Sequence, residues 1–235
     1  MALPKLKISE YTLTLPSTQE EIKFRPFLVK EQKILMIAQE SEDEKQITAA
    51  MKELILGCTF GVIDADVYPM FDIEYVFLQL RAKSVGSKIE LIVTCPDDEE
   101  TTVTVKIDLD EISVQMSVEH NTTVKLTDDI DLTFRYPRLK DLEGMNDDLS
   151  EVEKTLIMIY ECLESVTSGD EVTNRVDTTK AEILEFIDTM NNDQLQMIME
   201  FFETMPKLRH VIDVTNPKTK VKSEVLLEGL ESFLE

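Results

Sequence analysis

Alternation of apolar and polar residues divides the chain into recognisable segments. Period-two runs flank a turn-forming sequence at four places: residues 11–24, 89–107, 123–134 and 209–227. The turns contain residues typical of turns, such as Pro16-Ser17-Thr18 in the first and Asn216-Pro217 in the last. Because side chains alternate between the two faces of a strand, two such runs around a turn predict an antiparallel hairpin. We therefore expect four hairpins.

Between the hairpins, apolar residues recur every three to four positions, which predicts helices. Expected helices cover residues 28–38, 44–55, 72–85, 138–144, 150–166 and 230–234, and two more begin near Thr179 and Asn191. Ser41 with Glu44, and Ser150 with Glu153, have the spacing of capping boxes that begin helices. Gly86 stands where a glycine ends a helix. A polar loop is expected over residues 167–177.

The pattern of elements repeats along the chain. The segment Ile22–Pro26 is similar to Leu132–Pro137, and each closes a hairpin before a helix. The Thr94-Cys95-Pro96 turn is likewise similar to Thr215-Asn216-Pro217. An ancient duplication and a coincidence of common turn chemistry both account for this likeness.

We therefore predict an α+β fold in which antiparallel β-hairpins pack with helices, in two similar halves. Residues 1–119 form an N-terminal hairpin-helix-hairpin half. Residues 120–235 form a C-terminal helical half that closes with a basic hairpin.

Composition favours a folded, acidic, intracellular protein. Of the 235 residues, 43% are hydrophobic and 30% charged, with only 6 Gly and 8 Pro, so a long flexible linker is not expected. The net charge of −23 argues against nucleic-acid binding, which needs a basic face. No stretch approaches 18 apolar residues, and residues 1–9 lack an apolar signal core, so we expect neither membrane insertion nor secretion. Three cysteines without a close pair fit a reducing cytosol.

The sequence offers little catalytic chemistry. It contains no Gly-rich phosphate loop, no GxSxG and no HExxH motif. His120 and His210 are far apart in sequence, and each lies within or beside an expected strand. Cys95-Pro96 is half of a zinc knuckle, but Asp97-Asp98 occupy the place of the second cysteine. We therefore expect no enzyme activity, no catalytic residues, no cofactor and no metal.

A basic hairpin interrupts the acidic background. Between residues 207 and 222 the chain carries five basic side chains against the single Asp213: Lys207, Arg209, Lys218, Lys220 and Lys222. One interpretation is a binding site for another protein or for an acidic copy of the same chain. The other is protection of an edge strand against aggregation. Methionines concentrated in the C-terminal helices suit either a core or an adaptable binding surface.

The C-terminal strings Met205–His210, Asn216–Thr219 and Leu226–Phe233 resemble the baseplate hub subunit and hub assembly proteins of T4-type bacteriophages. The likeness extends to the Phe24-Arg25-Pro26 segment and the Cys95-Pro96 hairpin. It implies a phage tail morphogenesis protein, made in the host cytoplasm and found in the virion baseplate if it is retained.

Two roles follow from that resemblance, a hub component and a hub assembly chaperone. The implied partners are other baseplate hub proteins and tape-measure proteins, with several copies in the assembly and no nucleic acid or membrane. The alternative function is an acidic host-directed inhibitor, either a DNA mimic or an anti-defence protein.

Overall fold

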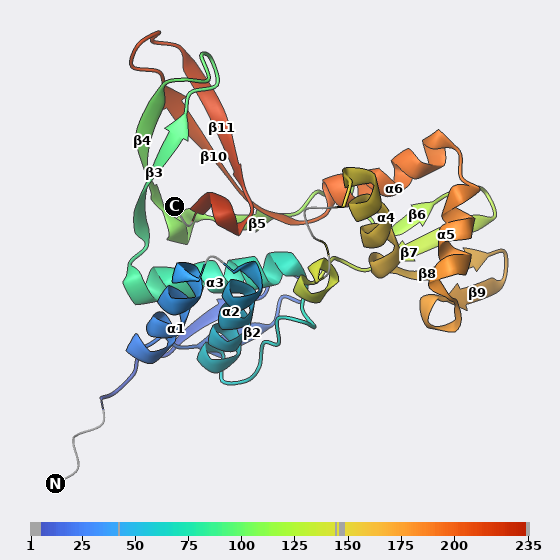
Figure 1. Ribbon diagram of the computed structural model, residues 1–235, viewed down its shortest axis with the longest axis horizontal. Coiled ribbons are helices and arrows are strands. Elements are labelled where there is room, and N and C mark those ends of the chain that lie inside the picture. The colour runs from blue at the N-terminus through green and yellow to red at the C-terminus, as the bar shows by residue number, and fades with distance from the viewer. Residues whose placement is uncertain (1–5, 42, 144, 146–148, 234–235) are drawn as a thin grey trace. The chain divides into compact units, whose positions relative to one another are not determined.

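The chain folds into two compact units. The computed structural model shown in Figure 1 describes residues 6–41, 43–143, 145 and 149–233. The first unit comprises Met1–Gln115 together with Lys207–Glu235, and the second comprises Met116–Pro206. Both combine helices with antiparallel strands, which confirms the predicted α+β class.

The first unit contains three small sheets. Its strands are β1 (Tyr11–Thr14), β2 (Glu21–Phe24), β3 (Lys88–Thr94), β4 (Thr102–Asp108), β5 (Ser113–Gln115), β10 (Lys207–Thr215) and β11 (Lys222–Glu228). Strands β1 and β2 form one hairpin and β3 and β4 another, while β11, β10 and β5 lie in that order in a third sheet. In each hairpin one face is buried, as the alternating sequence requires.

The helices of the first unit are α1 (Val29–Glu40), α2 (Glu44–Cys58) and α3 (Met70–Val85), with short 3-10 helices η1 (Leu109–Glu111) and η4 (Leu230–Phe233). Helix α3 is buried on most of its circumference, including Ile73, Val76 and Leu80. It contacts η1, η4, β5 and β10 as well as α2, so it forms the centre of this unit.

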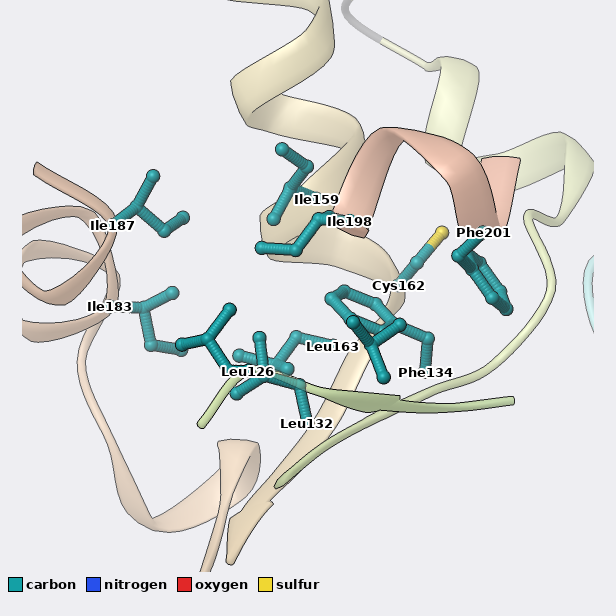
Figure 2. Packing of buried hydrophobic residues seen from close by; sticks show 11 residues of the cluster. Leu126, Leu132, Phe134, Ile159, Cys162, Leu163, Ile183, Ile187, Ile198 and Phe201 are labelled. Atoms are coloured by element: carbon teal, nitrogen blue, oxygen red, sulfur yellow. The ribbon is translucent and has the colours of Figure 1, made fainter. Parts of the chain in front are cut away.

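The second unit places helices against one four-stranded antiparallel sheet. The strands are β6 (Thr123–Lys125), β7 (Ile130–Phe134), β8 (Leu163–Ser168) and β9 (Glu171–Asn174), in that spatial order. The helices are α4 (Glu151–Cys162), α5 (Lys180–Asp188) and α6 (Asn192–Thr204), with 3-10 helices η2 (Leu139–Leu142) and η3 (Arg175–Asp177). Figure 2 shows the core, where Leu132 and Phe134 of the sheet meet Ile159, Ile198 and Phe201 of the helices.

The four expected hairpins are confirmed, and most helices lie where the spacing predicts them. The capping boxes at Ser150 and Thr179 are present. Gly86 ends α3 with a φ of +123°, a conformation that glycine adopts without strain. The segments expected at 138–144 and 230–234 are 3-10 helices, and Gly144 and Leu234 lie outside the described residues.

The predicted N-cap of α2 was wrong, although the helix begins at Glu44 as expected. Its N-cap is Asp43, whose carboxylate accepts hydrogen bonds from the backbone N–H groups of Lys45 and Gln46. Ser41 instead ends α1, where its hydroxyl donates to the carbonyl of Ala38 at 2.6 Å. A Ser three residues before a Glu therefore gave a false capping signal, because an Asp nearer the helix took the role.

The helix predicted over 150–166 was too long, and the polar loop over 167–177 was also wrong. Helix α4 ends at Cys162, because the carbonyl of that residue accepts the backbone N–H of Arg135 and Leu163 pairs with Phe134 in the sheet. Residues 163–174 then form the hairpin of β8 and β9. Pairing with β7 overrides the helical spacing of Leu163 and Val166.

The two compact units differ from the two sequential halves expected. The boundary at Gln115 is close to the expected one at residue 119, but the closing hairpin β10–β11 belongs to the unit of the N-terminal segment. The cause is long-range pairing, since β10 pairs with β5 from Lys207↔Gln115 to Arg209↔Ser113.

Candidate partner-binding surface

Two equivalent arginines follow equivalent hairpins. Arg25 follows β2, and its backbone N–H donates to the carbonyl of Cys58 at 3.0 Å. Arg135 follows β7, and its backbone N–H donates to the carbonyl of Cys162 at 2.8 Å. In both places the chain leaving a hairpin is thus fixed to the last residue of a helix.

The side chains of these arginines repeat the same arrangement. Arg25 donates to Glu31 at 2.8 Å, and Arg135 makes two hydrogen bonds with Asp141 at 2.6 and 2.9 Å. Each carboxylate stands six residues after its arginine and also accepts a backbone N–H, from Leu28 or Arg138, at 2.8 Å. Shared turn chemistry does not account for contacts that span about thirty residues, so the internal likeness extends to the three-dimensional structure.

Burial and these hydrogen bonds act in opposite directions on the carboxylates. Burial raises the pKa of Glu31, but hydrogen bonds from Arg25, Leu28 and Lys30 outweigh it and lower the pKa to about 2. Burial likewise raises the pKa of Asp141, but the hydrogen bond from Arg135 outweighs it and lowers the pKa.

Burial raises the pKa of the Cys58 thiol to about 11 and that of the Cys162 thiol to about 12. Both thiols are therefore protonated and unsuited to nucleophilic chemistry.

The hairpins β3–β4 and β10–β11 also share one register. At the open end of each hairpin, the cross-strand pair Lys88↔Asp108 corresponds to Arg209↔Glu228. Each pair lies six residues along the strand from the pair next to the turn. At the turns, Cys95 and Asn216 each accept a backbone N–H four residues on, from Glu99 and Lys220. Those two residues have φ values of +55° and +67°. The hairpins β3–β4 and β10–β11 therefore have matching geometry.

The tips of these two hairpins contact each other, and the hairpins lie side by side in Figure 1. The amide of Asn216, which is 1% exposed, donates to both carboxylate oxygens of Asp97 at 3.0 and 3.1 Å. The Thr219 hydroxyl also donates to Asp97. These hydrogen bonds, first from Thr219 and then from Asn216, lower the pKa of Asp97. The contact holds the basic tip beside the acidic one.

The structure does not bring the five basic candidates together. Lys207 and Arg209 lie at the base of the hairpin, where both contact Glu228, at 2.9 and 2.7 Å. Burial raises the pKa of Glu228, but the hydrogen bonds from Lys207 and Arg209 outweigh burial and lower the pKa. Both basic side chains are only partly exposed. Lys207 and Arg209 therefore stabilise the hairpin base.

The other three candidates, Lys218, Lys220 and Lys222, are exposed at the tip. Lys222 pairs with Thr215 across the hairpin. Thr215 lies six residues from Arg209 in the same strand, so Lys222 and Arg209 are separated by about 20 Å along the hairpin. We call Lys218, Lys220 and Lys222 the tip lysines. The acidic residues Asp98, Glu99 and Glu100 of the neighbouring turn lie on the other hairpin, so the tip carries both signs of charge.

His120 and two of the methionines pack inside the second unit. His120 hydrogen bonds to Thr204 at 3.0 Å and stacks on Tyr136, and burial lowers its pKa. Met158 and Met190 pack against the core of the second unit, while Met197 is 42% exposed. In the part of the chain that the structure describes, no three His, Cys, Asp or Glu side chains are grouped to hold a metal ion. None of the described helices is long and apolar enough to cross a membrane.

The repeated hairpins and arginines span most of the chain, and so does one match to a known family. The family model described as T4 bacteriophage base plate protein matches residues 8–235. The chain belongs to this family. Neither a curated protein nor a solved structure matches it. The T4-type baseplate resemblance of the C-terminal strings is thereby confirmed, and with it a structural role related to the phage tail baseplate.

In this baseplate protein, sequence reasoning identified the acidic turn at Asp97-Asp98 but did not predict its contact with the tip of the basic hairpin. A signal was present, because the Cys95-Pro96 turn matches the Asn216-Pro217 turn and carries the opposite charge. Matching hairpins of opposite charge are good candidates for pairing. The strand β5, of three residues, gave no comparable signal.

Proposed function

We propose that this baseplate protein acts by binding other proteins at the baseplate hub, as a hub component or as a chaperone of hub assembly, and not by catalysis. The match to the baseplate family over residues 8–235 carries the proposal. The buried, protonated thiols and the structural surroundings of His120 are in keeping with a role that involves no covalent chemistry. Hub and tape-measure proteins are the proposed partners.

The tip lysines are the proposed contact. They stand on a turn that is fixed by the hydrogen bonds between Asn216 and Asp97, so their backbone is ordered before a partner binds. They remain exposed, whereas Lys207 and Arg209 are engaged by Glu228. A partner surface with acidic side chains opposite the tip lysines and basic ones opposite Glu99 and Glu100 fits this charge pattern.

The experiment is affinity capture of the tagged full-length protein from infected cells, with the bound proteins identified by mass spectrometry. The proposal predicts recovery of phage hub or tape-measure proteins. Recovery of a host nucleic-acid enzyme in their place, displaced by added DNA, would contradict it and favour a DNA mimic.

The contact surface is tested by reversing three charges in the same assay. The variant K218E/K220E/K222E is expected to capture at least tenfold less of the partner, because three charges change sign opposite an acidic surface and the net charge changes by six units. The control K7E/K23E/K45E changes the net charge equally at exposed positions elsewhere in the first unit. Equal loss in both variants, or in neither, would remove the tip lysines from the account.

A further inference from the structure

Helix α1 has apolar residues on two opposite sides, but only one side is covered in the structure. Glu31 and Ala38 are its buried residues, and this side packs against α2 (Figure 1). Val29, Met36 and Ile37 are 66%, 51% and 65% exposed. A surface helix normally carries polar residues on the side away from its core contact, whereas α1 carries three large apolar side chains there. The uncovered side therefore calls for a partner.

The exposed residues form one continuous stripe. At 100° per residue, positions 29, 33, 36, 37 and 40 fall within about 100° of the helix circumference, opposite Glu31 and Ala38. Val29, Met36 and Ile37 supply the apolar side chains of this stripe, and Lys33 and Glu40 supply the charged ones. We call these five residues the α1 stripe. Its spacing of four, three and four residues is that of a helix packing along another helix.

The order of charges on the α1 stripe is opposite to the one that a free helix prefers. Lys33 lies in the first half of α1 and Glu40 is the last helical residue, where the last turn contains no basic residue. Glu31 in the first turn is already paired with Arg25 and Lys30 on the buried side. The placements of Lys33 and Glu40 are each unfavourable in an isolated helix. A second helix running antiparallel would place charges of opposite sign beside both ends.

We propose that the α1 stripe binds the α1 stripe of a second copy of this chain, with the two helices antiparallel around a two-fold axis. The same charge order on both helices then brings Lys33 of each copy toward Glu40 of the other. In this register Met36 of each copy covers Ile37 of the other. The stretch from Lys33 to Glu40 is therefore self-complementary, as a two-fold interface requires. This dimer is independent of the tip lysines and of the proposed function.

The expected dimer is weak. Two helices of three turns each bury a smaller surface area than the about 1,200 Å² that stable interfaces bury. The net charge of −23 on each copy also opposes association. At 0.15 M salt the Debye length of about 8 Å screens most of that repulsion, but not the charges in contact. Association should therefore depend on concentration.

Sedimentation velocity of the full-length protein from low to high micromolar concentration tests the proposal. The wild type should shift from monomer to dimer as the concentration rises. The variant M36K/I37K should raise the dissociation constant at least tenfold, whereas V172K/V176K, which changes two exposed valines of the second unit, should leave it unchanged. Circular dichroism checks that each variant is folded. A wild type that stays monomeric throughout, or a dimer that M36K/I37K does not weaken, overturns the proposal.

Charge exchange tests the antiparallel order. K33E and E40K should each weaken the dimer, because like charges then meet at both ends. The double variant K33E/E40K should restore it, as should an equal mixture of the two single variants. A double variant as weak as the single ones overturns the antiparallel arrangement, since parallel helices would set residue 33 against residue 33.

Discussion

Arg25 and Arg135 each connect a hairpin, a helix end and a capping carboxylate. Each guanidinium donates hydrogen bonds to three kinds of acceptor: a carboxylate, the backbone carbonyl of the next residue and a backbone carbonyl near the helix end. Lysine lacks the planar fork that makes this arrangement fit. Asp141 is 5% exposed, so its charge depends on Arg135 for compensation.

Removal of Arg135 should therefore destabilise the second unit. Arg135→Met leaves the carboxylate of Asp141 buried without its partner, and we expect a loss of about 3 kcal/mol in the free energy of unfolding. Urea denaturation followed by circular dichroism measures it. Lys140→Met, an exposed change two positions from the end of η2, is the control and should cost less than about 0.5 kcal/mol. Equal stabilities of the two variants would refute this role of Arg135.

Glu31 should give the stability of the first unit a dependence on acid pH. Its pKa in the folded protein is about 2, below its ordinary value of 4.5, so the unfolded chain binds more protons as the pH falls. The stabilisation is complete above about pH 5 and is lost on acidification toward pH 2. Glu31→Gln should lower the free energy of unfolding at pH 7 by about 2 kcal/mol.

Chemical denaturation at several pH values checks this expectation. The difference between wild type and Glu31→Gln should shrink as the pH approaches 2. Glu53→Gln, at an exposed position of the neighbouring helix α2, is the matched control at pH 7. A difference that stays constant from pH 7 to pH 2 would show that Glu31 acts through packing and not through its charge.

At the scale of elements, local sequence predicted the hairpins because alternation and turn residues agree there. It failed where a distant strand decided the outcome. Residues 163–166 have helical spacing but pair with β7, and Ser113–Gln115 become a strand only because β10 lies beside them. Long-range pairing leaves no local periodicity to read. The cap of α2 failed for a different reason, since Ser41 and Asp43 both have side chains that suit a cap.

Two glycines make a matched test of the helix ends. Gly86 has a φ of +123°, and no atom lies within 4 Å of an added Cβ, so Gly86→Ala should destabilise the protein through backbone strain alone, by about 1 kcal/mol. Gly57 lies within α2 with equally open space, and Gly57→Ala should stabilise the protein by about 0.5–1 kcal/mol. Thermal unfolding compares both. Changes of the same sign would contradict the assigned helix end at Gly86.

At the scale of the whole molecule, the sequence predicted the family and the repeated hairpins but not how the hairpins associate. The closing hairpin joins the first unit through Asn216, which contacts Asp97 at a sequence separation of 119 residues. The five basic candidates looked like one group because they are close in sequence. An extended strand separates residues close in sequence, and the pairing of Lys207 and Arg209 with Glu228 required the register. Of the five basic candidates, the three tip lysines are the ones that remain exposed for a partner.

The pairing of Gln115 with Lys207 allows the first unit to be tested without the second. These residues are register partners in antiparallel strands, so a two-residue Asn-Gly turn can join them after deletion of residues 116–206. We expect the shortened protein to unfold cooperatively with helix and strand content retained, as measured by circular dichroism. A shortened chain without a cooperative transition would show that the first unit depends on the second.

The central claim is that this baseplate protein works by binding other baseplate proteins. The most direct measurement is quantitative mass spectrometry of the chain across baseplate assembly intermediates and mature particles purified from infected cells. The account predicts that the chain is bound to hub-containing intermediates, with retention in mature particles marking a subunit and its loss marking a chaperone. A chain found free or bound to host proteins, and missing from every intermediate, would contradict it.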